Sequence, residues 1–155
     1  MNKYFLVAVV LFISIELKAQ GDFIKVNSTH YINFNCSLVL AIKGDKYTIM
    51  DFDRNSECNL LKNNFKPDNE VRKVITEYIA KHKNWIRVEP TSYTNGSEVN
   101  INGSEVYINL DFVEDIHKTK DGNSWVLTLS VANTPFSLKV ANEKGLLDYL
   151  GASHE

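Results

Sequence analysis

The sequence predicts an α+β protein of two small units, each a β-meander followed by a helix, after an N-terminal signal peptide. Three observations lead to this prediction: an apolar N-terminal run, alternating apolar residues in both halves, and helical apolar spacing at the end of each half. The expected divisions are a signal peptide over 1–19, a first unit over 21–84 and a second unit over 85–152.

The first nineteen residues have the layout of a cleavable export signal. Lys3 precedes an apolar run over residues 4–15, and Ala19 offers a small residue after which a peptidase would cut. The run has twelve residues, whereas a membrane-spanning helix needs about 20. We therefore expect a periplasmic or secreted protein with no stable membrane insertion after cleavage.

The charge balance gives no sign of an anionic partner. Cleavage would remove Lys3, Glu16 and Lys18 from the 17 basic and 19 acidic residues, leaving 15 and 18 and a net charge of −3. Such a balance lacks the basic footprint that nucleic acid or an anionic membrane requires. A mature chain of this length is one ordinary domain or two very small ones.

The chain has two cysteines, Cys36 and Cys58. In an oxidising compartment an even pair favours a disulfide over a metal site or a nucleophile, with two separate buried thiols as the alternative. Closing a loop of this length would restrict the unfolded chain by about 3 kcal/mol in the loop-entropy model. A disulfide between Cys36 and Cys58 is therefore expected.

The two halves share a faint internal similarity. Residues 23–26 and 85–88 have the same order of aromatic, Ile, basic and Val, and residues 31–36 and 107–112 both begin with Tyr-Ile-Asn. A glycine turn then precedes a new strand in each half. The pattern suggests an internal duplication, and chance similarity between two β-rich halves is the alternative.

Apolar alternation predicts the strands of both halves. In the second half it covers 106–112, 125–131 and 136–140. In the first half it covers alternate positions over 32–42, and a strand over 47–52 follows. Each half therefore supplies several half-buried strands.

Capping residues and helical spacing predict one helix in each half. Apolar residues recur at helical intervals from Val71 to Ile79, after a Pro-Asp-Asn start. Asn142 is expected to cap a second helix that Gly151 ends. Each helix would lie on the sheet of its own half.

The polar segment between the halves predicts a hairpin or ribbon. Two Asn-Gly turns begin at Asn95 and Asn102, seven residues apart. Insertions of this kind often hold binding loops, although drift in loop length is the commoner cause. The candidate surface contacts are Tyr93, Asn95, Asn102 and Tyr107.

No segment has the spacing of a metal, phosphate or nucleophile site. The stretch from Asp51 begins like a calcium loop, but Ser56 replaces the glycine of the sharp turn and Lys62 replaces the bidentate glutamate. The four histidines lack metal-ligand spacing. Only Asp51, Asp53 and His117 form a candidate weak site, and no metal or cofactor is expected.

Residues 105–150 resemble LytTR-type DNA-binding domains in an expected single strand from Tyr107 to Ile116, the Gly122 turn and the strand that follows. The resemblance implies a β-rich fold and a DNA partner. The export signal and the slightly acidic charge instead predict that no nucleic acid is bound.

These observations favour an exported, non-enzymatic binding or structural protein of the bacterial cell envelope. Its expected partner is a protein or an envelope component, because the sequence has no catalytic signature and its signal resembles those of Gram-negative exported proteins. A small secreted hydrolase and an inhibitor of a secreted enzyme are the alternatives.

Overall fold

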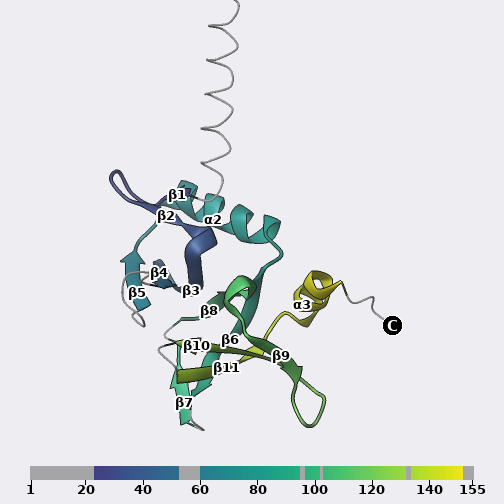
Figure 1. The fold of residues 1–155 in the computed structure, drawn as a ribbon. Coiled ribbons are helices and arrows are strands. Elements are labelled where there is room, and N and C mark those ends of the chain that lie inside the picture. The colour runs from purple at the N-terminus through teal and green to yellow at the C-terminus, as the bar shows by residue number, and fades with distance from the viewer. Residues whose placement is uncertain (1–22, 53–59, 95–96, 102, 132–133, 152–155) are drawn as a thin grey trace, which may run out of the picture. The chain divides into compact units, whose positions relative to one another are not determined.

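The computed structural model describes residues 23–52, 60–94, 97–101, 103–131 and 134–151. It divides into two compact units, Met1–Asn35 and Cys36–Glu155. The described chain has a mixed fold: a small antiparallel sheet in the first unit, and a large antiparallel sheet with two helices in the second (Figure 1).

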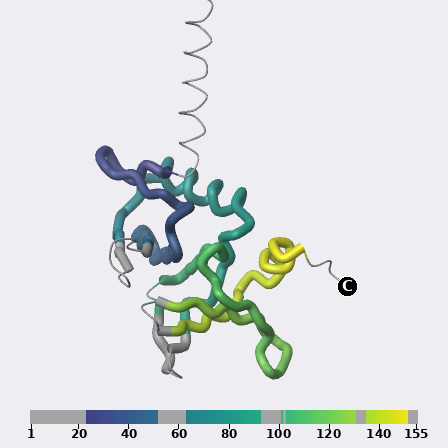
Figure 2. Tube along the Cα trace, in the orientation of Figure 1, coloured from purple at the N-terminus to yellow at the C-terminus, as the bar shows by residue number. Residues whose placement is uncertain are grey.

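The first unit contains a two-stranded antiparallel ribbon, drawn in purple in Figure 2. Its strands are β1 (Phe23–Lys25) and β2 (Tyr31–Asn33), and a short 3-10 helix, η1 (Phe34–Cys36), follows. Backbone hydrogen bonding closes the turn, where Val26 N–H donates to His30 O at 2.9 Å. Because both segments are extended strands, alternate side chains point to opposite faces of this ribbon.

The second unit is organised around one nine-stranded antiparallel sheet. Its strand order is β5-β4-β3-β8-β6-β11-β10-β9, and β7 pairs with β6 beside this path. The strands are β3 (Ser37–Lys43), β4 (Lys46–Phe52), β5 (Leu60–Phe65), β6 (Trp85–Thr94), β7 (Ser97–Asn100), β8 (Glu105–Asn109), β9 (Asp115–Lys118), β10 (Trp125–Val131) and β11 (Thr134–Val140). The helical segments are α2 (Asn69–Lys81), η2 (Leu110–Phe112) and α3 (Glu143–Leu150).

Each half of the sequence contains a meander followed by a helix. Strands β3, β4 and β5 pair in succession before α2, and β9, β10 and β11 do so before α3. Strand β3 also pairs with β8, with Leu40 opposite Tyr107, so both halves share one sheet. The predicted boundary between two units at residues 84 and 85 stays a prediction. Strand β3 lies before this boundary and β8 after it, and the two strands are paired.

The helices begin at the residues that their caps favour. The Asp68 carboxylate accepts a hydrogen bond from Val71 N–H at 2.8 Å, and the Asn142 amide oxygen accepts one from Gly145 N–H at 3.1 Å. Each cap satisfies a backbone donor that has no partner within the helix. Gly151 ends α3 at a φ of 68°, a left-handed conformation that glycine adopts readily.

Replacing Asp68 by Ala is expected to lower the free energy of unfolding by about 1 kcal/mol, because the first turn of α2 loses its acceptor. Asp68→Asn is the matched control, since its side-chain oxygen still reaches Val71 N–H. Urea unfolding of both variants, followed by circular dichroism, checks the difference. Equal losses in the two variants would contradict a capping role for Asp68.

An apolar cluster packs on one face of the large sheet. Its residues come from β3, β6, β8, β10, β11, η2 and α3. Leu38 of β3 belongs to it at the point where the pairing register with β4 shifts. The buried members are Leu38, Val39, Ala41, Ile86, Val88, Val106, Ile108, Leu110, Leu127, Leu129, Leu138 and Leu146. Burial of so many alternating residues explains why these segments form strands.

Strand β3 is buried on both of its faces. Val39 and Ala41 belong to the apolar cluster, whereas Leu40 pairs with Ile49 on the opposite face, where both are fully buried. A continuous apolar run is typical of a strand that is covered on both sides. Burial on both faces agrees with the place of β3 inside the sheet, between β4 and β8.

The expected single strand toward Ile116 is wrong, because the chain leaves the strand after Asn109. The Asn109 side chain accepts a hydrogen bond from Asp111 N–H at 3.1 Å, and Leu110 N–H donates to Asn84 O at 2.8 Å. These bonds turn residues 110–112 into η2 before β9 begins at Asp115. The expected continuous alternation over 32–42 is broken in the same way by η1.

Several predictions fall outside the described residues. The signal peptide over 1–19, Cys58, Asp53, Asn95 and Asn102 all lie there. The disulfide therefore stays a prediction, since only Cys36 of the pair is described. Within the described ranges, no helix combines the length and the apolar character needed to cross a membrane.

Candidate functional site

The candidate weak site is not assembled among the residues that the structure describes. Asp51 lies on β4 and His117 on β9, and five strands separate β4 from β9 in the sheet order. Asp51 Oδ2 accepts a long hydrogen bond of 3.5 Å from Asn63 Nδ2 on the adjacent β5. The two residues therefore do not form one reaction centre.

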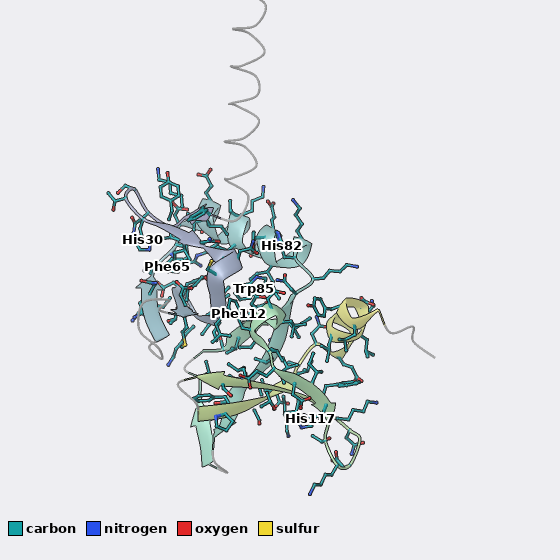
Figure 3. All side chains as sticks on the ribbon, viewed as in Figure 1. His30, Phe65, His82, Trp85, Phe112 and His117 are labelled. Carbon is teal, nitrogen blue, oxygen red and sulfur yellow. The ribbon has the colours of Figure 1, made fainter. Side chains whose placement is uncertain are left out.

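His117 instead has a local partner. Its Nδ1 lies 2.7 Å from Asp115 Oδ2, and both side chains are exposed on β9. Figure 3 shows His117 well away from His82, which lies at the end of α2. In the part of the chain that is described, no three His, Cys, Asp or Glu side chains gather to hold a metal ion.

Tyr107, a predicted surface contact, is half-buried between β3 and β6. It lies opposite Leu40 on one side and Arg87 on the other, and its hydroxyl donates to Glu105 Oε2 at 3.0 Å. Burial raises the pKa of the Tyr107 hydroxyl above its usual value, and the bond to Glu105 raises it further. Tyr107 is therefore held in the sheet rather than presented freely.

Glu105→Gln is expected to lower the pKa of Tyr107 toward its usual value, because the carboxylate charge beside the phenol is removed. A raised folded-state pKa contributes stability below about pH 10, which is lost as the pH rises through the folded-state pKa. Phenolate absorbance against pH checks this, with Tyr107→Phe subtracted to isolate one residue. An unchanged titration in Glu105→Gln would contradict the assigned cause.

The predicted hairpin between the halves is confirmed in its backbone. Strands β6 and β7 pair antiparallel from Thr91 opposite Asn100 to Thr94 opposite Ser97. Tyr93 lies on β6 within this hairpin. Whether its side chain binds anything stays a prediction.

A polar cluster holds the end of β8 inside the sheet. Asn109 is fully buried, its Oδ1 accepts from Asn84 Nδ2 at 3.0 Å, and its Nδ2 donates to Ser37 O at 3.2 Å. Asn84 Nδ2 also donates to Asp111 Oδ2 at 2.9 Å. These bonds link β3, β8 and the start of β6, which is a structural role.

The first unit has an exposed aromatic and cationic face that the sequence patterns did not single out. Phe23 is 50% exposed and Tyr31 is 56% exposed, and the Lys25 ammonium lies 5.8 Å from the centre of the Tyr31 ring. Strand alternation places Phe23, Lys25 and Tyr31 on one face of the ribbon, opposite buried Ile24 and Ile32. The alternation of Phe23-Ile24-Lys25-Val26 was the signal for this face.

The exposed face of this ribbon combines two kinds of contact group. Exposed aromatic rings offer apolar contact area, and an exposed strand offers backbone donors and acceptors. The described chain is therefore an α+β protein with a candidate binding surface on its two-stranded ribbon.

The chain matches no known family model, and no curated protein or solved structure is significantly similar to it.

Proposed function

We propose that the chain is an exported, non-enzymatic binding or structural protein of the bacterial cell envelope. We also propose that the two halves of its sequence, over 21–84 and 85–152, are copies of one β-meander-plus-helix unit. The observation that carries the proposal is a shared strand register in which equivalent residues are covered in one half and exposed in the other. The N-terminal apolar run with Ala19 at its end supports export.

The duplication is supported by strand pairings that agree residue by residue. Strand β1 pairs with β2 as β6 pairs with β8. The equivalent pairs are Phe23–Asn33 and Trp85–Asn109, Ile24–Ile32 and Ile86–Ile108, and Lys25–Tyr31 and Arg87–Tyr107. Because a slip of one residue would reverse every side chain, this agreement is informative.

The chain also leaves both second strands in the same manner. Asn33 accepts a hydrogen bond from Asn35 N–H at 3.1 Å, as Asn109 does from Asp111 N–H. A three-residue 3-10 helix follows in each case, ending at Cys36 in the first half. Such a local bond between side chain and backbone favours a turn over a continuing strand.

The meanders of the two halves also agree in strand register. If Tyr47 matches Trp125, then Asp51 matches Leu129, which pairs with Phe136. Asp51 pairs with Leu61, so Leu61 is the equivalent of Phe136 in this register.

Equivalent side chains differ in exposure between the two halves. Trp85 is 5% exposed, whereas Phe23 at the matching position is 50% exposed. Tyr107 is half-buried, whereas Tyr31 is 56% exposed. A surface that is covered in one copy and open in the other supports a binding role for the open copy.

The first experiment is an intact mass of the protein produced in a Gram-negative host, with thiol alkylation before and after reduction. We expect a chain beginning at Gln20 whose two cysteines react only after reduction. A full-length mass with free thiols would overturn export and the disulfide together.

The binding role is tested by cross-linking in the cell envelope, followed by assays of the purified protein with ester, peptide and phosphate substrates. We expect a captured protein or envelope component and no turnover. Turnover that is lost in a Asp51→Asn or His117→Ala variant would favour the hydrolase instead. Co-purification with one dominant secreted enzyme, and inhibition of that enzyme, would favour the inhibitor.

A further inference from the structure

The outer edge of β2 has backbone groups directed away from β1. Val26 N–H donates to His30 O, so the backbone of His30 faces β1. Backbone direction alternates along an antiparallel strand, so Ile32 also faces β1 and Tyr31 faces the outer edge. Among the described strands, β2 pairs with β1 alone.

The second half shows what covers the equivalent edge. Strand β3 pairs with β8 in antiparallel register, with Leu40 opposite Tyr107, the residue that matches Tyr31. Ile42 O accepts from Ser104 N–H at 2.7 Å, so Ile42 and Leu40 direct their backbone groups toward β8. The occupant of this edge is therefore an extended apolar segment of polypeptide.

We infer that the outer edge of β2, around Tyr31, binds an extended segment of a partner protein as an added antiparallel strand. The inference rests on the proposed binding function and names its partner class. Main-chain hydrogen bonds to Tyr31 would supply affinity, and alternate side chains would supply selectivity, as in other strand-addition complexes. The residue opposite Tyr31 would be apolar, as Leu40 is opposite Tyr107.

The charge of the ribbon adds a second requirement. Lys25 is the only Lys, Arg, Asp or Glu between residues 23 and 35, and its ammonium lies above the ring of Tyr31. A strand added beside Tyr31 would place its own same-face side chains near this ammonium. Charge complementarity therefore favours a segment that is acidic or neutral at those positions.

The test uses the mature full-length protein and a fluorescent peptide with the sequence of residues 37–43, measured by anisotropy. We expect saturable binding that weakens about tenfold when the peptide amide at Leu40 is N-methylated, because a backbone hydrogen bond is lost. Tyr31→Pro should weaken binding similarly, because it removes the N–H at the outer edge while sparing the bonds between β1 and β2.

Phe23→Pro is the matched control, because Phe23 lies on the same ribbon and directs its N–H toward the opposite edge. Circular dichroism and thermal melting show whether each variant keeps its fold. Tyr31→Ala keeps the backbone N–H at the outer edge. We therefore expect this variant to bind the peptide more tightly than Tyr31→Pro does.

Peptides carrying Ile42→Glu and Ile42→Lys test the charge requirement. We expect the Glu peptide to bind several-fold more tightly, with the difference shrinking at high salt. Equal affinity would overturn the acidic or neutral preference.

Three results would overturn the site itself: no peptide binding by the folded protein, binding unchanged in Tyr31→Pro, or binding unchanged by N-methylation. A protein dimer that Tyr31→Pro dissociates would also overturn it, by assigning this edge to a second copy of the chain. Export and capture in the envelope are measured separately. Failure of the peptide test with successful capture therefore defeats this edge alone, and the reverse defeats only the proposed cellular role.

Discussion

Replacing Asn109 by Ala is expected to lower the free energy of unfolding by about 3 kcal/mol. The side chain is fully buried, and its loss would leave the hydrogen bonds with Asn84, Asp111 N–H and Ser37 O unmade. A buried polar group without its partner costs about 1–3 kcal/mol, and several such groups are affected here. Urea unfolding followed by circular dichroism measures the change.

Asn123→Ala is the control for this prediction, because Asn123 lies exposed in the turn before β10. An exposed substitution of this kind should change stability by less than about 0.5 kcal/mol. A loss below about 1 kcal/mol in Asn109→Ala would show that water or a rearranged backbone replaces its bonds. The role assigned to the polar cluster would then be wrong.

Leu146→Ala is also expected to cost about 3 kcal/mol, because Leu146 is fully buried and anchors α3 in the apolar cluster. The helix has only eight residues, so it depends on this packing rather than on its intrinsic helix propensity. Trp125 Nε1 donates to Glu143 Oε1 at 3.0 Å, which links β10 to the first turn of α3. Displacement of the helix should therefore also change tryptophan fluorescence.

Leu150→Ala provides a control within the same helix, since Leu150 is 45% exposed. Its expected cost is below about 1 kcal/mol, as less apolar area leaves water. Equal losses for Leu146→Ala and Leu150→Ala would contradict the orientation of α3. Thermal unfolding of the two variants, measured under one buffer condition, separates these outcomes.

The helices could be predicted because their signals are local. Asp68 and Asn142 cap the first turns through bonds that span three residues, and Gly151 ends α3 where the sequence predicts. The apolar spacing from Val71 to Ile79 lies within one helix of the structure. Nothing distant in the chain is needed to specify these boundaries.

The strand boundaries after Asn33 and Asn109 could not be predicted from alternation. Leu110 and Phe112 keep the parity of Val106, so the pattern continues while the backbone turns. The turn is set by the Asn109 side chain bonding to Asp111 N–H, a contact that hydrophobic periodicity does not report. The recurrence of Tyr-Ile-Asn in both halves was the signal available for it.

The candidate site was predicted least well because exposure depends on distant pairing. Tyr107 lies at an outward parity of its strand, yet it is only partly exposed, with β3 paired beside it. Tyr31 has the same local sequence and remains exposed. Both residues lie in a Tyr-Ile-Asn sequence, and the strand order distinguishes their surroundings.

The pairing of β3 with β8 sets the order in which the chain can complete its sheet. The chain runs 62 residues from Lys43 to Glu105 between these partners. At a synthesis rate of about 5–20 residues per second, β8 would follow β3 by roughly 3–12 seconds. During that interval β3 would present an unpaired apolar edge, so the nascent chain has a defined period of aggregation risk and of dependence on chaperones.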